Sequence, residues 1–174
     1  MLMYQDPSMK EIVDDFCKEG RKQITQLNEH LFNLEDDLSD KSQLEGFGQV
    51  IDRMMGAAKS LEISTMGTFC ELGKAIGYKA SQVEEESLVS IVVAVLIDTV
   101  EILDTLLGKL ERGETLEIKE ISTDAFISRL QWLNDKFKHI KRASVAIGTD
   151  AESGANKNES LQDNIDDLLK QLGL

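Results

Sequence analysis

Residues 90–111, which distinguish a helical fold from a sheet, read SIVVAVLIDTVEILDTLLGKLE. The first part, Ser90–Ile97, is rich in β-branched side chains and taken alone is compatible with a buried strand. Beyond it the apolar positions continue at helical spacing, at Val100, Ile102, Leu103, Leu106, Leu107 and Leu110. That length and period indicate a helix. We predict a helix from about Ser81 to Glu111 that is buried on most sides and is ended by Arg112-Gly113-Glu114.

Working outward, four further segments show the helical period. We predict helices over about Met9–Leu38, Gln43–Leu61, Thr65–Tyr78 and Thr123–Arg142. Before the first of them, Pro7 between the capping residues Asp6 and Ser8 suits a first helical turn. A chain with a single proline and many leucine and charged residues also favours helices over a sheet. The sequence therefore predicts an all-α fold, an up-down bundle of four to five helices over residues 1–143.

Composition limits the classes of partner. The 174 residues carry a net charge of −13, which repels the phosphates of nucleic acids and anionic membrane surfaces. We therefore expect neither nucleic acid nor membrane as a partner. The apolar run Leu88–Ile97 is about half as long as a membrane span. The N-terminus lacks the basic region of a signal peptide, and we expect a cytoplasmic protein.

The cysteines and histidines do not form a metal-binding pattern. Cys17 and Cys70 belong to no Cys-x-x-Cys pair, and His30 and His139 lie far from both in the sequence. We expect no metal site. Both cysteines fall within apolar stripes, which predicts core positions, and both histidines are expected at the surface or at the edge of the core.

The C-terminal part differs in composition from the rest. Residues 144–160 contain almost no large apolar side chain, and we predict a flexible linker there. Residues 161–174, LQDNIDDLLKQLGL, form an amphipathic helical segment that places on one face Leu161, Ile165, Leu168 and Leu172. A short acidic helix on a tether is typical of a docking peptide. The alternative, that the segment folds back on its own bundle, is equally compatible with the periodicity.

The C-terminal segment resembles the peptide with which CheZ chemotaxis phosphatases dock on the response regulator CheY. The matching features are Gln162-Asp163, Asp166-Asp167, Leu168-Leu169 and the closing Leu172-Gly173. The resemblance covers fourteen residues at the chain end. It implies that a CheY-like receiver is contacted by Leu161, Ile165, Asp166, Leu168, Leu169 and Leu172.

A second stretch, Gly48–Met55, reads GQVIDRMM and resembles the CheZ segment that carries the catalytic glutamine. The resemblance implies that Gln49 is this glutamine. In that family an aspartate lies four positions earlier, where this chain has Glu45, whose side chain is one methylene longer. Ser42 and Glu45 also form a possible capping box, so that Glu45 has a purely structural alternative.

The order of the helices is unlike CheZ and resembles histidine phosphotransfer domains, such as the first domain of CheA kinases. That family has the motif Arg-x-x-His-x-x-Lys-Gly, and this chain has Arg53, Gly56, Lys59 and Ser60 at the corresponding positions. Glycine cannot carry a phosphoryl group, which excludes relay through position 56. Relay through His30 or His139 would be a third reading, although neither has the flanking motif. The CheZ resemblance implies a homodimer, and the phosphotransfer layout implies a monomer.

The chemistry of a glutamine suits one role at a phosphoaspartate. Its amide donates and accepts hydrogen bonds and can hold a water in line with an acyl phosphate. The receiver would supply Mg²⁺, so no cofactor of the chain's own is expected. Helical spacing places on one stripe Glu45, Gln49, Asp52, Gly56 and Lys59 or Ser60. We therefore expect catalysis by Gln49 and Glu45 and receiver docking by Asp52, Gly56 and Lys59.

Two functions follow from these patterns. The first is a phosphatase that acts on the phosphoaspartate of a CheY-like response regulator in bacterial chemotaxis. The second is a catalytically inactive module of phosphotransfer fold that binds or sequesters response regulators.

Gly46 and Gly48 each cost about 1 kcal/mol in a helix interior, which indicates a packing or a docking need at these positions.

Overall fold

Every regular element in the described part of the chain is a helix. The computed structural model describes residues 2–117, 124–145, 166, 167, 169–171 and 173, with side chains between 124 and 145 described up to residue 139. The elements are η1 (Met3–Gln5), η2 (Pro7–Met9), α1 (Lys10–Asp36), α2 (Lys41–Ser60), α3 (Ser64–Ser81), α4 (Glu86–Glu111) and α5 (Asp124–Val145). The prediction of an all-α fold is confirmed.

The chain divides into two compact units, Met1–Ser122 and Thr123–Leu174. The first unit holds α1 to α4, and the second holds α5 with the C-terminal segment. Most of the predicted linker, residues 146–160, lies outside the described residues.

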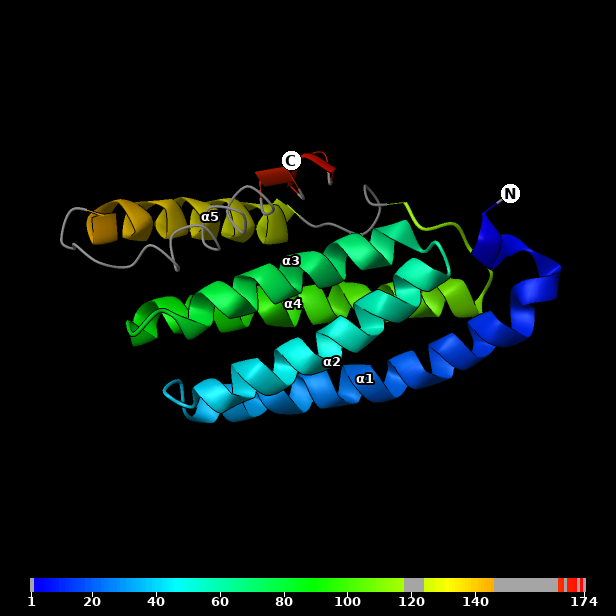
Figure 1. The fold of residues 1–174 in the computed structure, drawn as a ribbon, viewed down its shortest axis with the longest axis horizontal. Helices are drawn as coiled ribbons and strands as arrows, with labels where there is room; N and C mark the ends of the chain where they lie inside the picture. The colour runs from blue at the N-terminus through cyan, green and yellow to red at the C-terminus, as the bar shows by residue number, and fades with distance from the viewer. Residues whose placement is uncertain (1, 118–123, 146–165, 168, 172, 174) are drawn as a thin grey trace. The chain divides into compact units, whose positions relative to one another are not determined.

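In the first unit, α1 packs on α2 and α4, and α3 packs on the same two helices. Each helix runs antiparallel to the next (Figure 1), because the connections at 37–40, 61–63 and 82–85 are too short for any other path. Side chains from all four helices are fully buried between them, among them Leu27, Leu34, Phe47, Ile51, Met66, Phe69, Val92 and Leu103.

Residues 90–111 lie within α4. It is a helix of 26 residues, 13 of which are buried, as expected for a helix covered on most sides. It ends where Gly113 takes a left-handed φ of 69°, which glycine adopts without strain. Its predicted start near Ser81 is wrong, because α3 continues to Ser81. Glu86 instead lies in the first turn of α4, where a negative charge interacts favourably with the helix dipole.

The start of α2 corrects a second expectation. Asp40 is the N-cap, and its Oδ1 accepts a hydrogen bond from the backbone N–H of Ser42 at 3.1 Å. The capping box between Ser42 and Glu45 is therefore wrong, since the helix begins earlier, at Lys41. Glu45 is left exposed on the helix surface and takes no part in the cap.

An ion cluster joins α1 to α4. Arg21 Nε lies 3.0 Å from Oε1 of Glu111, and Arg21 Nη2 lies 2.7 Å from Oε2, a two-pronged contact that fixes the guanidinium plane. Arg21 Nη1 also donates to the carboxylate of Asp104. Next to this ion cluster, α1 and α4 also pack closely. Gly20 has no side chain, so the buried Leu107 lies directly against the backbone of α1.

Candidate functional site

The outward face of α2 carries the candidate residues. Glu45, Gln49, Asp52, Gly56 and Lys59 are all exposed, so the predicted stripe is one continuous face. At 3.6 residues per turn, Gln49 and Gly56 project in nearly the same direction, two turns apart. Asp52 and Lys59 are displaced toward α3, which places Gln49 near the middle of the exposed face.

Two side chains of this face are unpaired in the part of the chain that the structure describes. Among the described residues, no hydrogen bond or ion pair joins the side chain of Gln49 or that of Glu45 to another residue. The two side chains lie one helical turn apart. A carboxamide and a carboxylate are thus both available to a molecule that approaches α2 from outside.

Asp52 and Lys59, by contrast, are tied to α3. Asp52 Oδ1 lies 2.7 Å from Lys74 Nζ, and Lys59 forms an ion pair with Glu71. These pairs link α2 to α3. Asp52 or Lys59 could therefore bind a docking partner only after its ion pair with α3 had broken. Lys74 and Glu71 were not among the residues predicted from the sequence. The sequence did contain a signal for them. Lys74 and Glu71 lie on one polar stripe of α3, and their charges are opposite to those of their respective partners Asp52 and Lys59.

The glycines of α2 differ in what surrounds them. At Gly46 a Cβ would collide with the imidazole of His30. At Gly48 and Gly56 a Cβ would meet no atom within 4 Å. Packing therefore explains Gly46 and leaves Gly48 and Gly56, which flank Gln49 on the helix surface, without a structural reason to be glycine.

A groove of about 460 Å³ lies beside this face, between α2 and α3. Phe47, Gly48 and Gly77 belong to its lining, together with Glu45 and Tyr78. Tyr78 remains 40% exposed. The groove offers an apolar contact surface next to the unpaired carboxylate of Glu45, and it was not predicted from the sequence.

The histidines lie where they were expected. His30 is half-buried at the edge of the core, with Nδ1 2.9 Å from Oε1 of Gln43. His139 is exposed on α5. The contact with Gln43 and the packing against Gly46 give His30 a structural role at the junction of α1 and α2.

Both cysteines are free thiols in the core. Burial raises the pKa of Cys17 to about 11, and it raises the pKa of Cys70 further. Thiols in this state are poor nucleophiles and poor metal ligands at neutral pH. Within the described residues, no three His, Cys, Asp or Glu side chains come together as a metal site.

The C-terminal segment is described at residues 166, 167, 169–171 and 173, and most of these are helical. The expected docking residues Leu161, Ile165, Leu168 and Leu172 lie outside the described residues. Asp166 Oδ1 accepts a hydrogen bond from Asn134 Nδ2 of α5 at 2.9 Å and lies 3.2 Å from Lys138 Nζ. Burial alone would raise the pKa of Asp166, but the bonds from Asn134 and Lys138 outweigh it and hold that pKa below its ordinary value.

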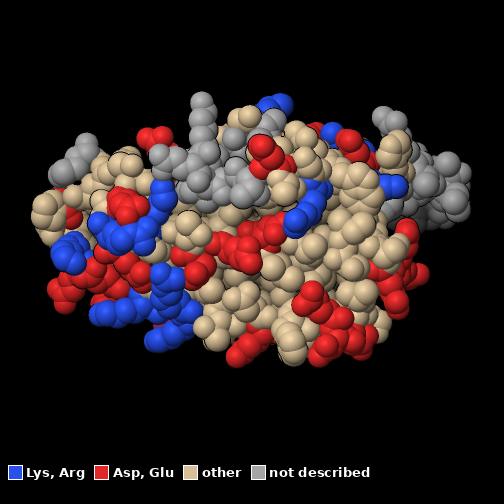
Figure 2. Space-filling view, turned by 180° about the vertical axis from the view of Figure 1, so that it is seen from behind, with Lys and Arg blue, Asp and Glu red and all other residues tan. Residues whose placement is uncertain are grey.

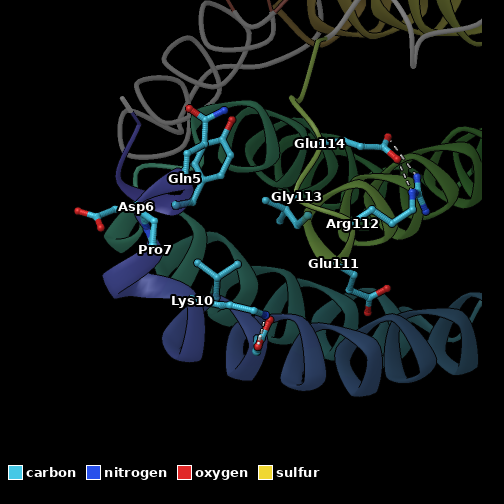
Figure 3. Close-up of a pocket in the computed structure, with 12 residues that line it drawn as sticks. Gln5, Asp6, Pro7, Lys10, Glu111, Arg112, Gly113 and Glu114 are labelled. Atoms are coloured by element: carbon cyan, nitrogen blue, oxygen red, sulfur yellow. Dashed lines mark hydrogen bonds and ion pairs between the residues drawn. The ribbon is translucent and has the colours of Figure 1, made fainter.

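A second cavity of about 470 Å³ lies between the N-terminal turns and the end of α4. Figure 3 shows Gln5, Asp6 and Lys10 on one side of it and Arg112 and Glu114 on the other. Four of its charged side chains are already paired with one another, since Lys10 Nζ lies 2.8 Å from Asp14 and Arg112 pairs with Glu114. The cavity holds no arrangement of nucleophile and base, and we place no site there.

Basic side chains of α1 form ion pairs with acidic side chains of the same helix. Lys18 lies 3.1 Å from Asp15, and Lys22 lies 3.2 Å from Glu19. On the face that Figure 2 shows, acidic and basic side chains interleave at the left, and acidic side chains stand without basic neighbours along the lower right edge. No basic patch that would attract an anionic polymer is seen on the described part of this face.

No protein-family model, no curated protein and no solved structure matches the chain. Of the helices in the described residues, none is both long and apolar enough to cross a bilayer. The candidate site therefore rests on the geometry of α2 and on the resemblances in its sequence.

Proposed function

We propose that this protein binds a CheY-like response regulator in the cytoplasm and promotes hydrolysis of its phosphoaspartate. The observation that carries the proposal is the position of Gln49, whose unpaired carboxamide projects from the middle of the exposed face of α2. A side chain in this position can enter the acidic cleft of a receiver without any rearrangement of the helix.

Each neighbour of Gln49 has a role in this proposal. The carboxamide holds a water in line with the phosphorus, and the receiver supplies the Mg²⁺ that balances the developing charge. Glu45, one turn away, pairs with a basic residue of the receiver. Gly48 and Gly56, which have open space around them, let the receiver backbone approach α2 closely.

The arrangement of α1 to α4 supports a likeness to phosphotransfer bundles. In both, consecutive antiparallel helices surround one core, and a motif on the second helix faces solvent. Gly56 stands where that family has the phosphorylated histidine, so position 56 cannot receive the phosphoryl group. We infer that the chain kept the surface that contacts receivers and acts there through Gln49.

A second candidate is a module that binds receivers without catalysis. The ion pairs of Asp52 with Lys74 and of Lys59 with Glu71 favour it, because they use part of the α2 face for the fold itself. Such a module would bind the phosphorylated receiver and leave its lifetime unchanged.

Phosphate release from a phosphorylated CheY-type receiver with Mg²⁺ tests the proposal. The protein should accelerate release, and Gln49→Ala should abolish the acceleration while receiver binding persists. Gln131→Ala, which alters an exposed glutamine of α5, is the matched control and should behave as the native protein. Binding without acceleration would establish the second candidate, and absence of binding would overturn both.

Two further measurements complete the test. Removal of residues 161–174 should weaken receiver binding, and unchanged affinity would exclude a docking role for the segment. Sedimentation of the free protein and of the complex gives the stoichiometry, which decides between the homodimer implied by one resemblance and the monomer implied by the other.

A further inference from the structure

One face of α5 is contacted by Asp166, a described residue of the C-terminal segment in the same unit. Asn134 and Lys138 lie four residues apart, on adjacent turns of one helix face. Both contact a single atom, Oδ1 of Asp166, at 2.9 Å and 3.2 Å. An amide and an ammonium group that converge on one carboxylate oxygen form a specific binding site for an acidic side chain. We call this site, formed by Asn134 and Lys138, the seat.

The burial of Asn134 makes this contact more than a surface ion pair. Asn134 is only 6% exposed, whereas the side chain of Lys138 keeps 42% of its surface. A buried amide that loses a hydrogen-bond partner is left incompletely solvated. The bond to Asp166 is therefore the better protected part of the seat, and Lys138 adds charge attraction that salt can screen.

The segment adds an apolar anchor on the same side as Asp166. Leu169 follows it by three residues, which places both on one face of a helical turn. Leu169 is 7% exposed, so its side chain is removed from water together with the Asp166 contact. A polar and an apolar anchor one turn apart hold the segment in a defined register.

We propose that α5 holds the C-terminal segment through Asp166 and so withholds the segment from partners. The identity of the partner as a receiver rests on the proposed function. Asp166 and Leu169 are among the residues that the resemblance assigns to receiver docking, and one side chain cannot occupy two seats at once. A receiver therefore competes with Asn134 and Lys138 for the segment. If the seat is closed about 90% of the time, the apparent affinity of the partner falls about tenfold.

Spin labels on the full-length chain test the seat. Exposed Asp135 on α5 and exposed Asp167 in the segment are replaced by cysteine and labelled, while the buried native thiols react slowly. The native seat should give a short, narrow distance distribution. Lys138→Glu, which sets a like charge against Asp166, should broaden and lengthen it. A broad distribution in the native chain, or no change on Lys138→Glu, would overturn the seat.

The matched control is Lys136→Glu. It makes the same charge change on the same helix, but Lys136 lies over the ring of Trp132, 5.2 Å from its centroid. This variant should keep the native distance distribution. The charge swap Lys138→Glu with Asp166→Lys should restore the short distance, which a merely unfolded variant would not do.

Accessibility of the segment is read with trypsin and with the receiver. Cleavage after Lys170 should be several-fold faster in Lys138→Glu than in Lys136→Glu, and equal rates would contradict the withholding of the segment. Receiver affinity should rise in Lys138→Glu alone, and equal affinity in both variants would exclude competition for the segment. If no variant binds the receiver, the proposed function is wrong, while the distances and cleavage rates still decide the seat and the withholding.

Discussion

The imidazole of His30 on α1 lies over Gly46 on α2, so closely that a Cβ on Gly46 would collide with His30 Cε1. The ring is held there by its contact with Gln43, 2.9 Å away. Glycine at position 46 thus serves the junction of two helices. Gly48 lies two residues further along the same helix. A Cβ there would have no atom within 4 Å, so Gly48 is not required by this junction.

Alanine at these two positions should separate the two cases. Gly48→Ala should raise the free energy of unfolding by about 0.5–1 kcal/mol, because alanine restricts the unfolded chain and favours the helix. Gly46→Ala should be less stable than Gly48→Ala by about 1 kcal/mol, because the imidazole must move and its hydrogen bond to Gln43 is strained or lost. Urea unfolding of both variants measures the difference.

The control for this comparison is the His30→Ala background. There the penalty at position 46 should disappear, so that both alanine substitutions stabilise equally. If Gly46→Ala stabilises the native protein as much as Gly48→Ala does, the close contact with His30 does not constrain the junction.

A larger side chain at Gly56 should separate stability from partner binding. Gly56→Leu introduces a good helix former into open space, so the free energy of unfolding should be unchanged or higher. Under the proposed function the same side chain blocks close approach of the receiver backbone, and affinity should fall at least tenfold. Thr105→Leu, on the exposed surface of α4, is the control and should leave affinity unchanged. Full affinity in Gly56→Leu would place the receiver elsewhere.

The periodicity of the sequence was sufficient for the helices and for the burial of α4, because both depend on residues a few positions apart. It was insufficient for contacts between distant positions. Arg21 and Glu111 are 90 residues apart, and neither carries a local signal of the pairing. The groove beside Glu45 likewise depends on how α3 approaches α2. The exposure of Gln49 followed from the helical stripe, whereas the partners of Asp52 and Lys59 required the packed bundle.

The turn between α2 and α3 contains a strained residue. Glu62 has a φ of 56°, the left-handed conformation, while the N–H of Ile63 bonds back to the carbonyl of Ala58 at 2.9 Å. This hydrogen-bond pattern commonly places glycine at the left-handed position. Glu62→Gly should therefore raise the free energy of unfolding by about 1 kcal/mol, since glycine adopts this φ without a Cβ clash.

Glu62→Ala is the matched control for that prediction. It removes the carboxylate and keeps the Cβ, so it should leave the free energy of unfolding nearly unchanged. Calorimetric melting of the two variants distinguishes relief of backbone strain from loss of a surface charge. Equal effects of glycine and alanine would attribute the change to the charge.

The contact between Arg21 and Glu111 predicts a pH dependence of stability. Hydrogen bonds from Arg21 are the main reason that the pKa of Glu111 lies below its ordinary value. A carboxyl whose pKa is lower in the folded state stabilises the fold above its unfolded pKa, about 4.3 for glutamate. That contribution is lost as the pH falls through the folded pKa. Both side chains are about two-fifths exposed, 39% and 41%, so solvent screens the pair.

Arg21→Gln should accordingly lower the free energy of unfolding at pH 7 by no more than about 1 kcal/mol, the range of partly exposed ion pairs. Its deficit relative to the native protein should shrink between pH 5 and pH 3, because protonation of Glu111 removes the same interaction from the native chain. Lys22→Gln removes an equal charge from α1, but among the described residues Lys22 pairs only with Glu19 on its own helix, at 3.2 Å. Any small loss in the free energy of unfolding of Lys22→Gln should therefore not come from a lost contact between α1 and α4. A deficit of Arg21→Gln that stays constant from pH 7 to pH 3 would show that Glu111 contributes nothing through its charge.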